Sequence, residues 1–130
     1  MKVISIQEPY ATLISLGKKQ IETRSWNTNY RGEIYIHASL SKKFLKEVTD
    51  EEVLMLIDNL KLNYGKIICK AKLKDCVKMT KDYIKEIKKN KQEYILGIYE
   101  EGRYAWILEE IECLNEPIET KGKLGIWEYK

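Results

Sequence analysis

Four residues near the start of the chain are close together in a pattern that could bind a polar ligand. They are Lys19, Glu22, Arg24 and Trp26. The last three alternate, as residues on one face of a β-strand do. Charged groups are rarely fully buried unless they are paired, because removing them from water is costly. This face therefore favours a polar cleft for a flat, hydrogen-bonding ligand over a hydrophobic core.

Each charged residue of this stretch has two readings. Lys19 could bring positive charge to a phosphate or carbonyl oxygen, or act as a base if burial lowers the pKa of its amine. It could also be a solvent-exposed turn lysine, as we expect for Lys18. Glu22 could accept a hydrogen bond from a base amine, and Arg24 could donate to a phosphate or a base edge. A structural ion pair between Glu22 and Arg24 is the alternative, and it is compatible with ligand binding.

The elements that position these residues follow from the apolar pattern and the turn residues. A strand at Val3–Ile6 precedes a helix that begins at Pro9, where proline is favoured, and ends at Gly17. The motif itself is predicted as a strand from Gln20 to Trp26. Other strands are predicted at Glu33–Ala38, Ile67–Val77, Tyr104–Leu114 and Ile126–Tyr129. Helices are predicted within Ser41–Leu62 and over Lys81–Asn90, with connections at residues 91–103 and Pro117–Gly125.

This order of elements predicts one domain over residues 1–130 and an α+β fold. The strands do not alternate regularly with helices, which disfavours a parallel βαβ sheet. We expect a mostly antiparallel sheet curled into a barrel, with helices packed outside it. The hydrophobic share of 44% and the charged share of 33% are ordinary for a globular domain.

Charge is unevenly distributed along the chain. Residues 61–91 contain eleven lysines against three acidic residues, and residues 100–119 contain seven glutamates against one arginine. The lysines, which alternate with apolar residues from Lys70 to Lys74, could form a basic face that attracts a polyanion. Solvated faces of ordinary strands and helices are the alternative and, from charge alone, the better one.

Cysteine and histidine usage argues against a metal site or a disulfide framework. Cys69, Cys76 and Cys113 form no CxxC pair, and His37 is the single histidine. We expect reduced thiols, no metal, no cofactor and a cytoplasmic location. The apolar runs are too short for a membrane span, and the opening residues become polar too soon for a signal peptide.

Five segments, in order along nearly the whole chain, resemble the ASCH family. The first two are Ser5-Ile6-Gln7-Glu8-Pro9-Tyr10-Ala11 and the Gly-x-Lys-x-x-Glu-x-Arg motif of Gly17–Arg24. The third comprises Arg24-Ser25-Trp26, Tyr30-Arg31-Gly32 and Ile36-His37-Ala38-Ser39. The last two are Tyr104–Leu108 and Lys121–Trp127. The resemblance implies a PUA-like β-barrel with a cleft beside the first helix, in a family associated with RNA or nucleotide recognition.

The resemblance also implies a possible activity. Some small ASCH relatives hydrolyse N4-acetylcytidine with a lysine that matches Lys19, a threonine nucleophile and a separate glutamate. This chain has Glu22 at the threonine position, and Thr23, one residue on, faces the other side of a strand. The amidohydrolase mechanism is therefore not carried over intact, and the sequence does not place the second carboxylate. If the chain is an enzyme, Lys19 and Glu22 are its catalytic candidates.

The remaining candidates are residues that could line the same cleft. Tyr10 is favoured for base stacking over the three tryptophans, which are more often core residues. A lone histidine is more often structural, and Gly122 lies in a loop where glycine would let the backbone approach a ligand. The predicted ligand-binding set is Gln7, Pro9, Tyr10, Lys19, Glu22, Arg24, Trp26, His37, Ser39, Lys121 and Gly122.

Three functions remain open from the sequence. The first is binding of RNA or a nucleotide-like small molecule in the cleft. The second is hydrolysis of N4-acetylcytidine or a similar modified nucleoside. The third is a protein-interaction domain that uses the acidic 100–119 region to meet a basic partner, which only the charge composition supports.

Overall fold

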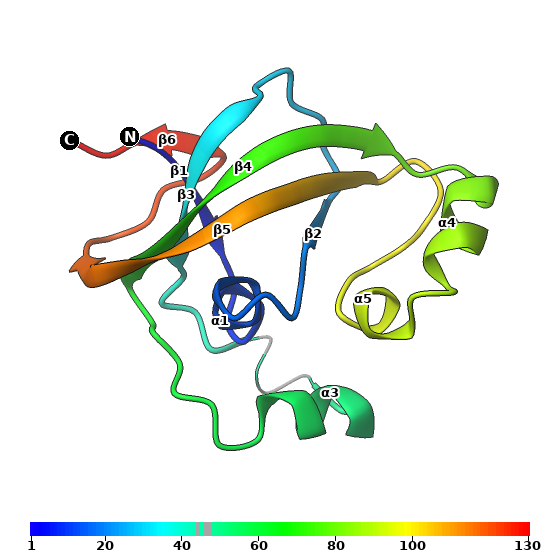
Figure 1. Ribbon diagram of the computed structural model, residues 1–130, viewed down its shortest axis with the longest axis horizontal. Helices are drawn as coiled ribbons and strands as arrows, with labels where there is room; N and C mark the ends of the chain where they lie inside the picture. Colours follow the sequence, from blue (N-terminus) through cyan, green and yellow to red (C-terminus); the bar gives the residue numbers. More distant parts are fainter. Residues whose placement is uncertain (44, 46–47) are drawn as a thin grey trace.

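Two long neighbouring strands organise the sheet of this protein. The computed structural model describes residues 1–43, 45 and 48–130, and within these residues six strands form one curved sheet in the order β2-β5-β4-β3-β1-β6 (Figure 1). The strands are β1 (Lys2–Ile6), β2 (Ile21–Arg24), β3 (Gly32–Ala38), β4 (Lys66–Lys78), β5 (Tyr104–Glu119) and β6 (Ile126–Glu128).

The sheet is mixed but mostly antiparallel. β1 pairs with β3 in parallel, whereas the pairs β1–β6, β2–β5, β3–β4 and β4–β5 are antiparallel. Register shifts interrupt both ladders of β4, and such bulges bend strands and increase their twist. The result is a barrel-like α+β fold, as predicted.

Alternation along β4 separates a buried face from a charged one. Cys69, Ala71 and Leu73 are buried, and Lys72 and Lys74 are exposed. The buried face joins the main core, in which α1 (Tyr10–Ser15) places Ala11 and Ile14 against the sheet. Burying one such aliphatic side chain contributes about 1.5–3 kcal/mol, so this contact fixes α1 beside the ends of β1 and β2.

The helices are short, and side-chain caps mark where three of them begin. Asp50 caps α3 (Glu51–Ile57), Thr80 caps α4 (Lys81–Ile87) and Asn90 caps α5 (Lys91–Ile95). Each cap side chain accepts a backbone N–H of the first turn, which no carbonyl of the helix can satisfy. After α1, Gly17 adopts a φ of 75°, a conformation that favours glycine and lets the chain turn into β2.

Several predicted boundaries are wrong. The first helix begins at Tyr10 rather than Pro9, and the motif strand ends at Arg24 rather than Trp26. Residues 91–103 are not only a connection, because they contain α5, and β5 continues to Glu119 instead of ending at Leu114. Within Ser41–Leu62 the structure shows α3, while residues 44 and 46–47 lie outside the described residues.

The lysines of β4 face glutamates of the neighbouring strands. Lys70 lies 3.5 Å from Glu33 and 3.7 Å from Glu112, and Lys72 and Lys74 each lie 3.7 Å from Glu109. Three of the eleven lysines of residues 61–91 are therefore compensated by glutamates of the neighbouring strands. This arrangement weakens the argument for a polyanion face on β4 and for a basic protein partner on β5.

Candidate functional site

A cavity of about 300 Å³ opens between the start of α1, strand β2 and the segment that follows α5. Its walls combine charged, amide and apolar side chains. The lining residues are Ser5, Ile6, Gln7, Tyr10, Glu22, Thr23, Arg24, Ile95, Leu96, Gly97, Ile98 and Arg103. Four of the predicted ligand-binding residues, Gln7, Tyr10, Glu22 and Arg24, are thus brought together on one concave surface.

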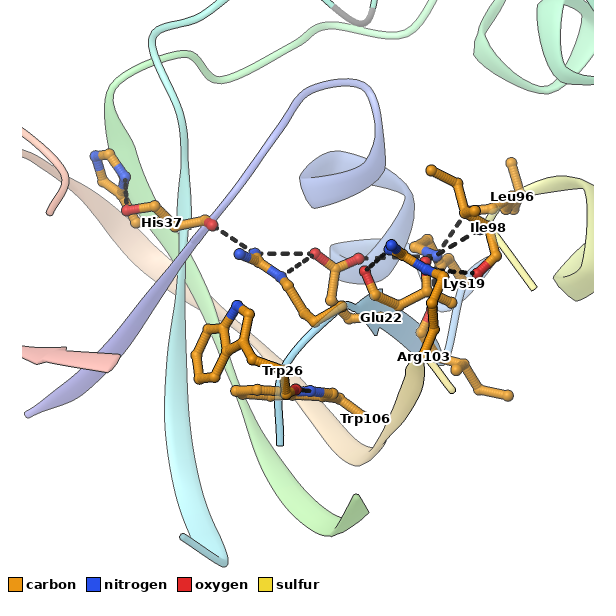
Figure 2. Close-up of polar contacts among 12 residues, drawn as sticks. Lys19, Glu22, Trp26, His37, Leu96, Ile98, Arg103 and Trp106 are labelled. Atoms are coloured by element: carbon orange, nitrogen blue, oxygen red, sulfur yellow. Dashed lines mark hydrogen bonds and ion pairs between the residues drawn. The ribbon is translucent and has the colours of Figure 1, made fainter. Parts of the chain in front are cut away.

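Glu22 and Arg24 form the predicted ion pair within this cavity (Figure 2). Arg24 Nε donates to Glu22 Oε2 over 3.1 Å, and Arg24 Nη2 lies 3.0 Å from the same oxygen. Arg24 Nη2 also donates to the carbonyl of Ser5 at 2.7 Å, which ties β2 to β1. The side chains keep 13% and 23% of their surface exposed, so the pair is rigid and still reachable by a ligand. The ion pair is therefore structural and still leaves both side chains accessible to a ligand.

Lys19 is buried, with only 1% of its surface exposed, whereas Lys18 is exposed. Its ammonium donates to the carbonyls of Ile21 at 2.5 Å and Leu96 at 2.7 Å, and it lies 4.0 Å from Glu22 Oε1 (Figure 2). Burial lowers the pKa of Lys19, and the Glu22 charge opposes that shift. The surface-lysine reading is wrong for Lys19, which stands behind Glu22 and links β2 to the cavity wall.

Glu93 is a second carboxylate near Lys19 that the sequence did not identify. It lies on α5, is buried, and accepts the backbone N–H of Gln20 at 2.5 Å. Burial raises the pKa of Glu93, and the charge of Lys19 partly offsets this rise. Its Oε2 has no hydrogen-bond partner among the described residues. Residues 91–103 were read as a connection and contain three glutamates, Glu93, Glu100 and Glu101, and no local pattern distinguishes Glu93 from the other two.

The segment after α5 is the other wall that sequence reasoning missed. Thr23 Oγ1 accepts the N–H of Ile98 at 3.1 Å, and Arg103 donates to the carbonyls of Ile98 at 3.2 Å and Thr23 at 3.4 Å (Figure 2). These contacts hold the segment against the edge of β2. The two contacts of Thr23 join residues 75 and 80 positions apart in the chain, so no local sequence pattern indicates them.

The residues before and at the start of α1 contribute differently to the cavity. The side-chain oxygen Oε1 of Gln7 is buried and accepts no hydrogen bond within the described chain. Tyr10 lies with its ring centroid 5.6 Å from the Lys19 ammonium, and burial raises the pKa of Tyr10. Pro9 is buried and is joined to Glu8 by a cis peptide bond. It does not line the cavity.

A second hollow of about 490 Å³ continues from the first on the other side of Arg24. Ser5, Gln7 and Arg24 line both spaces. The second hollow contains the other predicted loop and strand residues, namely His37, Ser39, Lys121 and Gly122. Its remaining lining residues are Leu40, Lys123, Leu124 and Gly125.

His37 has a structural contact on each ring nitrogen. Nε2 faces the carbonyl of Thr120 at 2.8 Å, and Nδ1 faces the hydroxyl of Ser5 at 3.0 Å. Because a carbonyl can only accept, Nε2 carries the hydrogen, and in the neutral ring Nδ1 accepts from Ser5. The Ser5 oxygen in turn accepts from Trp127 Nε1 at 3.2 Å. His37 therefore anchors the loop after β5 to the sheet.

None of the three tryptophans lines either hollow. Trp106 and Trp127 are buried, in agreement with the core reading. Trp26 is 36% exposed and packs edge-on against Trp106, with 4.7 Å between the ring centroids (Figure 2). Trp26 thus lies beyond the end of β2, outside the two hollows to which Glu22 and Arg24 contribute.

The described residues show no metal site, no disulfide and no membrane-spanning helix. Among the described residues, no group of three or more His, Cys, Asp or Glu side chains could hold a metal ion. The three cysteines are free, and burial raises the pKa of Cys69 to about 12. In the part of the chain that the structure covers, no helix has the length and apolar character needed to cross a membrane.

Comparisons with known proteins agree with this architecture. The structure of an ASCH protein from Zymomonas mobilis is similar with a TM-score of 0.57 and 21% identity, covering 91% of this chain and 72% of that one. Human (Homo sapiens) Activating signal cointegrator 1 is 38% identical over 47 residues, which are 36% of this chain and 8% of that protein. The family model for the ASCH domain matches residues 4–118. The chain therefore belongs to the ASCH domain family.

Proposed function

We propose that this protein binds RNA or a nucleotide-like ligand, with a base seated in the cavity beside α1. The observation that carries the proposal is the convergence of Gln7, Glu22 and Arg24 on one concave surface of about 300 Å³. Small-ligand sites are typically concave, largely apolar and equipped with a few placed polar groups. Membership of the ASCH family, which is associated with RNA or nucleotide recognition, supports the same reading.

The polar groups of the cavity complement the edge of a base. Glu22 Oε2 is occupied by Arg24, whereas Oε1 lies 4.0 Å from Lys19 and can accept from an exocyclic amine. Arg24 presents a guanidinium that donates to carbonyl or phosphate oxygens. Ile6 and Leu96 supply apolar surface beside these groups. A planar ligand with donors and acceptors on its edge would satisfy both kinds of wall.

Calorimetric titration with the four ribonucleosides and with short single-stranded RNA tests the proposal. Glu22→Gln keeps the size of the side chain but removes its charge and its purely accepting character, so binding should weaken by about tenfold or more. Glu116→Gln, at an exposed position of β5, is the matched control and should bind as the wild type does. Absence of binding to every base-bearing ligand at low salt would overturn the proposal.

A hydrolase acting on a modified nucleoside is the second candidate, favoured by the environment of Lys19. Burial lowers the pKa of this amine, and the carboxylates of Glu22 and Glu93 both act on it. In this reading Glu22 takes a proton from a water that attacks the acyl carbonyl of N4-acetylcytidine. Glu22 then returns this proton to N4 as the C–N bond breaks, so that acetate and cytidine are the products. Lys19, which is buried 4.0 Å from Glu22, acts on the reaction through that carboxylate. Because Glu22 replaces the family's threonine, this reading uses water as the nucleophile.

Product formation from N4-acetylcytidine separates the two candidates. The wild type is compared with Lys19→Ala and with Lys18→Ala, the exposed neighbour, after circular dichroism has shown that each variant is folded. The hydrolase reading expects turnover in the wild type and Lys18→Ala and its loss in Lys19→Ala. Equal trace-level turnover in all three proteins would remove it and leave the binding function.

A further inference from the structure

We propose that the second hollow holds a phosphate group of the ligand whose base occupies the first cavity. The inference rests on the proposed binding function and narrows its ligand to a phosphorylated ribonucleotide, either free or within an RNA strand. Both sources present the same chemistry, a phosphate oxygen anion one sugar away from the base. A bare nucleoside would leave the second hollow empty.

The positive charge of the second hollow is only partly compensated, because Glu22 pairs with Arg24 but not with the two loop lysines. Arg24, Lys121 and Lys123 line it, and no acidic side chain is among its lining residues in the described chain. Lys121 and Lys123 are exposed and form no ion pair with any described residue. A concave surface with one sign of charge concentrates counter-ions, so an anionic group is the ligand that this hollow favours.

The loop that carries these lysines is fixed to the sheet. Thr120 is held through its carbonyl by His37 Nε2 at 2.8 Å. Gly122 packs so closely that a Cβ atom there would lie 2.5 Å from Ser5 Oγ and 2.9 Å from His37 Nδ1. Real Cβ atoms do not approach so closely, which explains glycine at this position. The backbone between the two lysines is therefore held against Ser5 and His37, which also line the hollow.

The boundary between the two spaces suits a sugar. Ser5, Gln7 and Arg24 line both, and Gln7 Oε1 is a buried acceptor without a partner among the described residues. A buried acceptor without a donor costs free energy, so a ligand hydroxyl that donates to Gln7 Oε1 would remove this cost and favour binding. A ribose hydroxyl is the donor that lies between a base and its phosphate. Base, sugar and phosphate would thus occupy consecutive parts of one composite site.

The test compares ligands that differ only in the phosphate. Calorimetry at low salt measures the dissociation constants of each ribonucleoside, its 5′- and 3′-monophosphates, and a short RNA containing the same base. For the tightest base, at least one phosphorylated form should bind about tenfold more tightly than the nucleoside. The double variant Lys121→Gln/Lys123→Gln should lose this gain while binding the nucleoside as before.

A second double variant controls for net charge. Lys81→Gln/Lys85→Gln removes two exposed lysines of α4, neither of which lines the hollow, and should keep the gain. With RNA, log K decreases as log salt increases. In Lys121→Gln/Lys123→Gln, the loop variant, this slope should be less steep by about 0.7 if one phosphate contact is lost. If the RNA binds more tightly than both monophosphates, the phosphate belongs to an RNA strand. If the RNA and the tighter monophosphate bind equally, the ligand is a free nucleotide.

The outcomes distinguish this inference from the function on which it rests. A nucleoside that binds as tightly as its phosphorylated forms would overturn the phosphate site and leave base binding intact. A phosphate gain that persists in the loop variant would also overturn it. Gly122→Ala, which displaces the backbone without changing charge, should reduce the gain in a protein that remains folded, and an unchanged gain would count against the site.

Discussion

Replacement of Lys19 by methionine tests whether the buried ammonium holds the cavity wall in place. Lys19→Met keeps the length and most of the volume of the side chain but removes the nitrogen. The carbonyls of Ile21 and Leu96 would each lose a donor, at present 2.5 Å and 2.7 Å away. Leu96 follows α5 directly, so the change would free the segment that faces Glu22 across the cavity.

The size of the effect follows from two opposing contributions. A carbonyl that loses a buried partner costs about 1–3 kcal/mol, which gives roughly 2–6 kcal/mol for two. Removing a buried charge from a site that lowers its pKa offsets part of this loss. We expect a net loss of about 2 kcal/mol in the free energy of unfolding. For a chain of 130 residues this corresponds to a decrease of about 7 °C in the melting temperature.

Urea denaturation followed by tryptophan fluorescence measures this loss. The matched control is Lys18→Met, one residue away and exposed, which should change stability by less than about 0.5 kcal/mol. If the two variants unfold at the same urea concentration, the ammonium does not stabilise the segment. The structural account of Lys19 would then be refuted.

The pH dependence of the same pair of proteins gives an independent check. Because the pKa of Lys19 is lowered on folding, the unfolded chain binds more protons between the folded pKa and 10.5. The free energy of unfolding therefore gains a contribution that rises with pH in that window. Lys19→Met removes this contribution, so the stability difference between wild type and variant should widen as pH rises. A difference that stays constant or narrows would contradict the lowered pKa.

Three further predictions concern thiols, a cap and the cavity wall. Cys113, which is exposed, should react with a thiol reagent in the folded protein, whereas Cys69, whose pKa burial raises to about 12, should react only after denaturant is added. Thr80→Ala removes the N-cap of α4 and should cost about 1 kcal/mol in urea denaturation; no change would show that this cap does not stabilise α4. Gly97→Ala would place a Cβ 2.9 Å from Thr23 Cγ2, so we expect a loss of about 1–3 kcal/mol and weaker nucleoside binding, and unaltered affinity would show that the segment is not part of the site.

Local patterns predicted most of the strands and the helices with strong signals. The alternation around Cys69 and Leu73 identified β4, and the helix predicted over Lys81–Asn90 begins where α4, capped by Thr80, begins. These features succeed because side-chain periodicity and capping act within a few residues. α5 was missed because five residues from Lys91 to Ile95 are too few for a helical period to emerge.

The end of β5 was missed for a different reason. Pro117 indicated a loop, because proline cannot donate to a sheet ladder. β2 pairs with β5 only from Tyr104 to Ile107, so the distant half of β5 has an edge that β2 does not cover. Proline is tolerated at such an edge. The register shifts between β4 and β5 further obscure the alternation on which strand prediction depends.

The sequence by itself determined which chemical groups the site has, since Lys19, Glu22 and Arg24 are adjacent in the motif and strand geometry orients the last two. Only the tertiary structure decided their environment. Leu96, 77 residues away from Lys19, accepts from its ammonium, and Thr120 anchors His37 from 83 residues away. Burial, pKa and cavity shape depend on which distant segments exclude water, and a linear pattern carries no such information.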